Sequence, residues 1–392
     1  MTATLAYPQQ SPCTRDALPR VCVVNHNAYG QLTNQPTRHA GGAERQTAIA
    51  ARWFAANGYE VSVVVWDEGQ QDNVVIDGVR VIKMCTPDAG LPIVRFVHPR
   101  WTTLNTALRR ADADVYLYNR GDLGLGQLVR WCRRNRRKSL YFVASDVDCV
   151  AALPEHKTSR ERILYRYGVR NVDYIVAQTS KQKRLLREQF DRDAVVLPMP
   201  SDYEPAASLA GRSAPAATGT EVLWVGRIAD MKRLEWLLDL AEKFPAVQFN
   251  VAGDANNDSE YVRDLKKRAV EIANVALLGR LAQKQIRPLY ERASLFCNTS
   301  VWEGFPNTFL EAWSVGLPLL TTFQPDDLVE REKLGWMSHS FEQLCDNMTH
   351  ILSNPEEWRT RAANCWKYYC ENHALHVAMS RYAEVACELA TA

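Results

Sequence analysis

Short apolar runs recur along the first half of the chain. They lie at residues 21–24, 61–66, 79–83, 115–119, 140–144, 174–177 and 194–197, and several are rich in valine. Short runs that are apolar throughout and bounded by polar residues are typical of strands buried on both faces of a sheet. The pattern therefore predicts a parallel β-sheet that is covered by helices.

Stretches with helical periodicity separate several of these runs. One opens at Gly41-Gly42, places apolar residues at Ala48, Ala51 and Phe54, and ends shortly afterwards. Others lie around residues 101–110, 125–132, 160–167 and 180–190. An order of strand, helix and strand implies parallel pairing through right-handed crossovers. The first half is thus predicted to be a doubly wound α/β domain.

The second half repeats this organisation after a change in composition. Residues 201–219 are rich in Ala, Ser, Pro and Gly and mark a linker. Strand patterns resume at 222–225, 248–252, 275–278, 295–298 and 317–321, a helix is expected over 259–272, and the chain is helical from about 354. We predict an N-terminal domain over residues 18–200 and a C-terminal domain over residues 220–374.

The composition is that of an ordinary globular protein. The 392 residues are 46% hydrophobic and 23% charged, so each half can bury its own core. No run of about 18 apolar residues exists to span a membrane, and the N-terminus lacks the features of a signal peptide. The ten cysteines form no C-x-x-C pair and are expected to be core thiols. We expect a cytoplasmic protein.

Charge is distributed unevenly along the chain. Residues 1–200 hold 28 Lys and Arg against 19 Asp and Glu, and the remainder is correspondingly acidic. A basic half, with the run Arg130–Lys138, suits an anionic partner such as a phosphate-bearing acceptor or an anionic membrane. Ordinary surface charge is an equal alternative. No known nucleic-acid module surrounds the run, so nucleic acid is not an expected partner.

Two segments carry the residues that suit a phosphate ligand. Gly41-Gly42 precedes a helix and offers free backbone N–H groups, although a Gly-Gly pair alone is often only a turn. Gly226-Arg227-Ile-Ala-Asp-Met-Lys232 follows the first strand of the second domain, where open α/β sheets bind ligands. Arg227 can bind a diphosphate with two hydrogen bonds, and Lys232 can add a compact charge.

The segment Glu303-Gly-Phe-Pro-Asn-Thr-Phe-Leu-Glu311 joins a predicted strand to a helix that begins at Asn307. A carboxylate in the loop can face sugar hydroxyls, and one a turn into the helix can accept two hydrogen bonds from a diol such as ribose. The alternative is that Glu303 is a loop charge and Glu311 a solvated helix position. The glycines from Gly121 to Gly126 have the wrong spacing for a dinucleotide fingerprint and indicate a loop and a helix start.

Together these motifs resemble the retaining glycosyltransferases of family four, the glycosyl transferases group 1, over nearly the whole chain. The resemblance implies the α/β fold called GT-B, in which two Rossmann-like doubly wound domains face each other across a central cleft. It also implies that the last helix, over about 375–392, packs back on the N-terminal domain. No bound metal or other cofactor is implied; a nucleotide sugar, UDP- or GDP-linked, is the co-substrate.

The resemblance also assigns roles to residues. Arg227, Lys232 and Glu303 would be catalytic, with the two cations on the donor diphosphate and Glu303 on the sugar. Glu311 would bind the ribose hydroxyls. Further donor-binding positions are Gly41, Gly42, Gly226, Leu278, Gly279, Gly304, Phe305, Pro306, Asn307 and Thr308. Many family members carry a His-Asp pair after an N-domain strand, whereas this sequence has Ser145-Asp146. These two residues are expected to contact the sugar or the acceptor, or else an Asp there caps the next turn.

The implied activity is transfer of a sugar from a nucleoside-diphosphate sugar to a glycan or lipid-diphosphate-linked acceptor, in polysaccharide biosynthesis, with peripheral contact to an anionic membrane. A nucleotide-sugar-binding protein without transferase activity is an alternative, because Ser145 replaces the usual His. A GT-B epimerase or a phosphorylase shares the architecture, but no motif for a pyridoxal-bearing lysine is visible.

Overall fold

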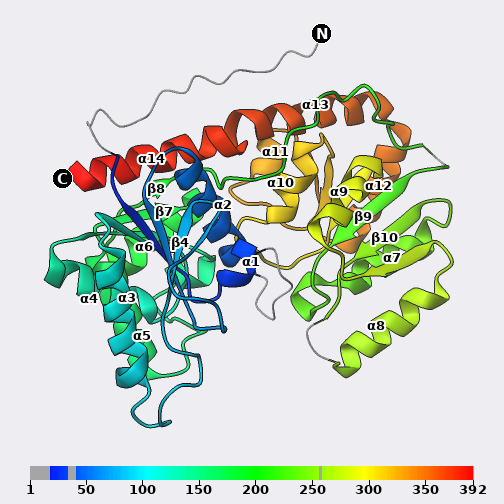
Figure 1. Ribbon diagram of the computed structural model, residues 1–392. Helices are drawn as coiled ribbons and strands as arrows, with labels where there is room; N and C mark the ends of the chain where they lie inside the picture. Colours follow the sequence, from blue (N-terminus) through cyan, green and yellow to red (C-terminus); the bar gives the residue numbers. More distant parts are fainter. Residues whose placement is uncertain (1–17, 34–40, 217, 256–257, 392) are drawn as a thin grey trace. The chain divides into compact units, whose positions relative to one another are not determined.

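The computed structural model describes residues 18–33, 41–216, 218–255 and 258–391. The chain divides into two compact units: unit 1, residues 1–200 and 378–392, and unit 2, residues 201–377. Each unit is an α/β domain built on one predominantly parallel sheet (Figure 1). Within the described residues, no helix is both long enough and apolar enough to cross a lipid bilayer.

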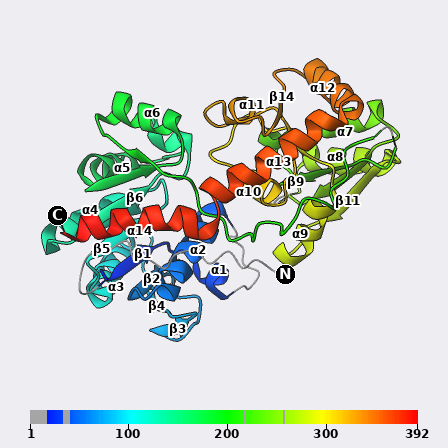
Figure 2. The ribbon, with the colours of Figure 1, turned by 90° about the horizontal axis from the view of Figure 1, so that it is seen from above.

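The unit 1 sheet has eight strands in the order β3-β4-β2-β1-β5-β6-β7-β8, and the labels in Figure 2 follow that order from β3 to β6. Only the β3–β4 pair is antiparallel among the pairings described. The strands are β1 (Val21–Val24), β2 (Val61–Val65), β3 (Val74–Ile76), β4 (Val79–Lys83), β5 (Val115–Tyr118), β6 (Lys138–Phe142), β7 (Tyr174–Ala177) and β8 (Val195–Val196).

Helices cover both faces of this sheet (Figure 1). They are α1 (Tyr29–Thr33), α2 (Gly42–Ala56), a π-helical turn (Phe96–Trp101), α3 (Thr102–Ala111), α4 (Gly124–Asn135), a 3-10 turn (Asp146–Cys149), α5 (Ser159–Asn171), α6 (Ser180–Phe190) and α14 (Leu375–Thr391). In α14, Tyr382 packs on Phe142 with ring centroids 5.2 Å apart. The last helix thus contributes to the core of unit 1.

The glycine run before α4 serves packing rather than a dinucleotide. The helix begins at Gly124, which confirms the expected loop and helix start. A Cβ at Gly126 would lie 2.1 Å from the carbonyl oxygen of Leu164, so glycine lets α4 and α5 pack closely. Eight cysteines are free thiols, but Cys387 is disulfide-bonded. The expectation that every cysteine is a simple core thiol is therefore wrong at Cys387.

The unit 2 sheet has six strands in the order β11-β10-β9-β12-β13-β14, all parallel. They are β9 (Glu221–Val225), β10 (Gln248–Ala252), β11 (Val275–Gly279), β12 (Leu295–Asn298), β13 (Leu319–Thr321) and β14 (Gly335–Met337). The helices are a 3-10 turn (Asp230–Lys232), α7 (Leu234–Lys243), α8 (Glu260–Glu271), α9 (Gln283–Arg292), α10 (Asn307–Ser314), α11 (Leu328–Arg331), α12 (Phe341–Ser353) and α13 (Pro355–Asn372). Numbered within the unit, the strands run 3-2-1-4-5-6, the order of dinucleotide-binding folds.

Candidate functional site

In unit 2 the strands β9 and β12 are neighbours, although β10 and β11 separate them in sequence. The strand order reverses at this pair, and open α/β sheets bind ligands beyond the carboxyl ends of strands at such a point. The segment that leaves β9 carries Arg227 and Lys232, and the one that leaves β12 carries Glu303. Both sequence motifs therefore emerge at the same edge of the sheet.

Hydrogen bonds hold these two segments together. The backbone N–H of Val301 donates to the carbonyl oxygen of Met231 at 2.8 Å, and the Thr299 hydroxyl donates to that of Lys232 at 2.6 Å. The Arg233 guanidinium donates to the carbonyl oxygen of Thr299 at 2.8 Å. These bonds fix the position of one motif relative to the other.

The two motifs meet in an ion pair between the Lys232 ammonium and the Glu303 carboxylate. The side chains are 19% and 13% exposed, so both are largely shielded from water. The Ser300 hydroxyl also donates to Glu303, at 2.7 Å. Arg227 is exposed, and no hydrogen bond or ion pair to its side chain is found within the described part of the chain. A pocket of about 560 Å³ lies beside it, lined by residues 227–231 and by Ser259, Tyr261 and Val262.

Helix α10 begins at Asn307, as predicted, and follows Pro306 directly. Its residue Glu311 is only 6% exposed, so the alternative that it is a solvated helix position is wrong. Phe305 packs on Trp313, with ring centroids 6.2 Å apart, and this contact anchors the loop before the helix. The loop from Gly304 to Thr308 thus presents the first backbone N–H groups of α10 next to Glu303.

Glycines allow the ends of three neighbouring strands to approach closely. Gly253 has φ +146°, and a Cβ on it would lie 1.8 Å from the carbonyl oxygen of Gly226. Its backbone N–H donates to the carbonyl oxygen of Gly279 at 2.8 Å. At Gly226, Gly253 and Gly279 the backbone at the carboxyl edge of the sheet therefore carries no side chain that would cover it. The predicted roles of Leu278 and Gly279 in binding the nucleotide-sugar donor stay predictions.

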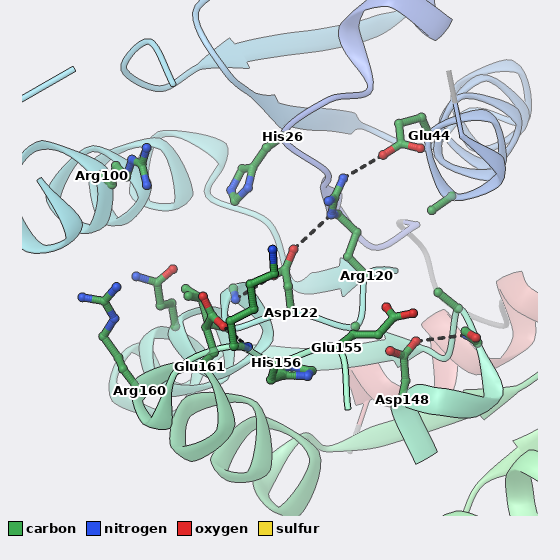
Figure 3. Close-up of a pocket in the computed structure, with 18 of the residues that line it drawn as sticks. His26, Glu44, Arg100, Arg120, Asp122, Asp148, Glu155, His156, Arg160 and Glu161 are labelled. Carbon is green, nitrogen blue, oxygen red and sulfur yellow. Dashed lines mark hydrogen bonds and ion pairs between the residues drawn. The ribbon is translucent and has the colours of Figure 1, made fainter. Parts of the chain in front are cut away.

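Unit 1 contains a second pocket, of about 700 Å³, at the carboxyl edge of its own sheet (Figure 3). Its residues come from the segments that follow β1 and β5, from the start of α2, and from the segments around α5. Gly42 lines it and Gly41 does not. A Cβ at Gly41 would lie 2.3 Å from the Glu44 carboxylate. A side chain at position 41 would therefore have to displace this carboxylate.

Arg120 is the centre of a charge network in this pocket (Figure 3). It donates to the Glu44 carboxylate at 2.7 Å and to the Asp122 carboxylate at 3.0 Å. The Tyr118 hydroxyl donates to Asp122 as well. Burial acts to raise the pKa of Asp122, but Arg120 and the Tyr118 hydroxyl outweigh it and hold this pKa below its usual value. The Asp122 carboxylate is therefore charged, and Arg120 is paired with acidic groups on two sides.

His26 points into the same pocket and stacks on Trp66, with ring centroids 4.6 Å apart. Burial lowers its pKa to about 4, so the imidazole is neutral near pH 7. Within the described residues, its Nε2 atom is buried and makes no hydrogen bond. Burial also raises the pKa of Asp148, which lines the pocket, to about 7. Sequence analysis found neither His26 nor Arg120, because no motif surrounds them.

Ser145 and Asp146 have different surroundings. The Ser145 backbone N–H donates to the Asp148 carboxylate at 3.0 Å, and Ser145 directly precedes the 3-10 turn that contains Asp148. Ser145 lines the pocket. Asp146 instead forms an ion pair with Lys181 at 2.8 Å and accepts a hydrogen bond from Gln182 at 3.1 Å. The turn-capping alternative thus holds, with Asp148 as the capping acid.

Comparison with known families agrees with this geometry. Residues 41–200 match the glycosyl transferase 4-like domain, and residues 219–354 match the family described as glycosyl transferases group 1. The chain belongs to the group 1 glycosyl transferases. The two matches coincide with the two α/β units and with the segments that carry the motifs.

Individual relatives of this group 1 chain are distant. An uncharacterized glycosyltransferase of Haemophilus influenzae is 26% identical over 50% of this chain and 56% of its own length. The GtfA subunit of a UDP-N-acetylglucosamine–peptide N-acetylglucosaminyltransferase of Streptococcus pneumoniae is 27% identical over 42% of this chain and 35% of its own length. The chain thus spans about half or less of these relatives. The crystal structure of Anabaena HepE with UDP-glucose has a TM-score of 0.72 at 16% identity, covers 95% and 100% of the two chains, and shows the fold.

Proposed function

We propose that this chain is a retaining glycosyltransferase that moves a sugar from a UDP- or GDP-sugar to a glycan or lipid-linked acceptor, in polysaccharide biosynthesis. The single observation that carries the proposal is the ion pair of Lys232 with Glu303 at the switch point of the unit 2 sheet. It unites a phosphate-binding motif with a sugar-binding motif. Family membership and a relative whose name includes a UDP-sugar substrate support the donor class.

In this proposal the donor diphosphate lies along the segment that follows β9. Breaking the bond between the sugar C1 and the phosphate oxygen places negative charge on that oxygen. Arg227 and Lys232 stabilise the charge, and preorganised groups of this kind contribute roughly 3–4 kcal/mol each. Glu303 and the N–H groups from Gly304 to Asn307 orient the sugar, and Glu311 binds the ribose hydroxyls.

Retention in a single displacement, without a covalent glycosyl-enzyme intermediate, requires the acceptor to attack from the face that the phosphate leaves. We propose that the acceptor oxygen forms a bond to C1 while the departing phosphate oxygen takes the acceptor proton. The positive charge that this step needs is assigned to Arg227 and Lys232, so no metal or other cofactor takes part. A direct imidazole role at position 145 is lost because the residue is Ser145.

The acceptor is assigned to the unit 1 pocket. Its walls combine donors, such as Arg120, with acceptors, such as Asp122 and the neutral His26, and this mixture suits sugar hydroxyls. Two predicted site residues, Gly42 and Ser145, line this pocket. The basic charge of residues 1–200 suits a lipid-diphosphate acceptor, and a cytoplasmic location with peripheral membrane contact belongs to the same proposal.

A panel of UDP- and GDP-sugars tests this function in two stages. A true donor raises the unfolding temperature, because ligand at 100 times its Kd stabilises the folded state by about 2.7 kcal/mol. The same donor, mixed with lipid-diphosphate and oligosaccharide acceptors, then releases nucleoside diphosphate and forms a glycoside with the donor's anomeric configuration. Binding without product under any acceptor would favour the binding-protein alternative, and an inverted product would contradict retention.

A further inference from the structure

Apolar side chains are concentrated in one short surface segment of unit 1. Leu91, Ile93, Val94 and Val97 are 72%, 92%, 50% and 58% exposed. Ten large hydrophobic residues are exposed in the described part of the chain, and these four fall within residues 91–97. Scattered exposed apolar residues are ordinary, but a contiguous group marks an interaction surface.

The segment 91–97 contributes one residue to the lining of the unit 1 pocket. It follows β4 and leads into the π-helical turn, and its residue Phe96 lines the pocket together with Arg100. The Arg160 guanidinium lies 4.0 Å from the centroid of the Phe96 ring. Figure 3 shows Arg100 and Arg160 along the same side of the pocket. The exposed apolar residues therefore lie next to the mouth of the pocket.

Cations surround the apolar residues. Arg95 lies within the segment and Arg100 just after it, while Arg160 reaches the segment from α5. Asp88 precedes the segment by three positions, and Glu161 follows Arg160, where its carboxylate accepts hydrogen bonds from the backbone N–H groups of Lys157 and Thr158. Ile163, 64% exposed, lies one helical turn after Arg160 and extends the apolar surface. Exposed apolar side chains with arginines beside them match the boundary between acyl chains and anionic headgroups.

The basic run Arg130–Lys138 does not share this location. It lies at the end of α4 and continues into β6. Because β6 starts there, the run lies at the amino edge of the sheet, opposite the edge that holds the pocket. Its residue Arg137 is also paired with Asp112 and Asp114, at 2.5 and 3.3 Å. The run expected to contact a membrane is thus on the wrong side to deliver an acceptor to the pocket.

We propose that residues 91–97 insert into the anionic leaflet of a lipid bilayer and that the pocket beside them receives the headgroup of a lipid-linked acceptor from that leaflet. This inference rests on the proposed function for the acceptor class. The aliphatic side chains enter the acyl boundary, Arg95, Arg100 and Arg160 contact lipid phosphates, and the sugar of the acceptor reaches the hydroxyl-binding residues of the pocket.

Vesicle flotation of the full chain tests the proposal without any donor or acceptor. Vesicles of phosphatidylcholine are compared with vesicles that also contain phosphatidylglycerol. Wild type should float with the anionic vesicles and be released by salt. Leu91→Ser/Ile93→Ser should lower the partition coefficient by at least about tenfold, and Arg95→Gln should lower it by about fivefold for one lost surface charge. Val270→Ser is the matched control, because Val270 is 78% exposed in unit 2, and it should float like wild type.

Several results would overturn this proposal. The proposal is wrong if wild type does not bind anionic vesicles, or if Leu91→Ser/Ile93→Ser floats like wild type. Loss of self-association in the double variant without vesicle binding would mean that a second copy covers the segment. An unchanged unfolding temperature and an unchanged shift with UDP show that the variant is folded. If the protein binds vesicles but turns over no donor, the membrane-binding proposal is supported and the proposed function is wrong.

Discussion

Both units place charged residues where the strand order of the sheet reverses, but they use them differently. In unit 2 the cations come from the β9 exit and the carboxylate from the β12 exit, and Arg227 is exposed. In unit 1 Arg120 is held between Glu44 and Asp122. The Glu44 side chain is only 8% exposed, so the cation of this network is already paired within the fold.

This difference in charge pairing indicates which of the two sites binds a charged ligand. Charge that is already compensated stabilises the fold and positions neighbours, whereas an exposed cation without a partner is available to an incoming anion. Substitution of Arg227, which has no partner in the described part of the chain, should therefore reduce turnover more than stability. Substitutions in the unit 1 network should do the reverse.

The largest effect is expected from Arg227→Ala. The side chain is exposed and carries no described partner, so its loss should leave the unfolding temperature unchanged. It should lower kcat/KM by about 10²–10³-fold, as expected for removal of one group that stabilises charge in the transition state. Release of nucleoside diphosphate is the readout. Lys267→Ala, at an exposed position of α8, is the matched control, and equal activity of both variants would refute the role of Arg227.

Arg120→Ala should have the next largest effect, on stability. It leaves Glu44 buried without its cation, and an unpaired buried charged group costs about 2–3 kcal/mol. The unfolding temperature of unit 1 should fall by about 5–10 °C, while the shift produced by UDP in unit 2 stays the same. Arg134→Ala, exposed in the same unit, should change nothing. An Arg120→Ala protein with the unfolding temperature of wild type would show that the network does not stabilise the fold.

The pH dependence of stability should separate two buried groups of the unit 1 pocket. The folded pKa of Asp148 is raised from 3.8 to about 7, so Asp148 favours folding when protonated and costs stability as pH rises through this window. The folded pKa of His26 is lowered from 6.5 to about 4, so His26 costs stability as pH falls through that window. The two groups change the free energy of unfolding with pH in opposite directions, by about 1 kcal/mol per pH unit each.

Thermal unfolding from pH 4 to pH 7 tests this opposition. Relative to wild type, Asp148→Asn should become more stable as pH rises, and His26→Gln should become more stable as pH falls. Asn and Gln keep a hydrogen-bonding side chain of similar size, so packing is largely preserved. Parallel pH profiles for both variants and wild type would contradict the burial of these groups.

Ser145→Ala should have the smallest effect on stability. The capping bond to Asp148 comes from the Ser145 backbone N–H, which alanine keeps, so the free energy of unfolding should change by no more than about 0.5 kcal/mol. If Ser145 also contacts the acceptor, KM for the acceptor should rise while KM for the donor stays constant. Thr at this position retains the hydroxyl and should restore both values. An acceptor KM that does not change would show that the Ser145 hydroxyl does not contact the acceptor.

Much of the fold was predictable because its strands are continuous apolar runs. The strands β7, β10 and β12 and the helix α6 have the predicted bounds, and α10 begins at the predicted residue. Strands β3 and β14 and helices α1, α7, α9, α11 and α12 were not predicted. Strand β14 has only three residues, and α9 contains an internal proline, so neither gives a clear periodic pattern.

The unit 2 edge could be found from sequence because its residues lie in two continuous motifs that follow strands. The pocket of unit 1 could not, because His26, Arg120 and Phe96 come from separate segments and only the fold brings them together. The burial of Glu311 was equally hidden, since a helix with few polar residues does not show which face is covered. The pairing of Lys232 with Glu303 follows from strand order, which sequence spacing does not give.

Titration calorimetry of UDP and GDP with the full chain tests the central claim most directly. We predict that one of the two binds wild type and that Lys232→Ala weakens binding by at least tenfold, because a charge-assisted bond to phosphate contributes about 1.5–3 kcal/mol. Lys232→Ala/Glu303→Gln, which removes the carboxylate left without its partner, should recover part of that loss, and Arg120→Ala should bind like wild type. Equal affinity of wild type and Lys232→Ala, or no affinity for either diphosphate, would contradict a diphosphate site at this edge.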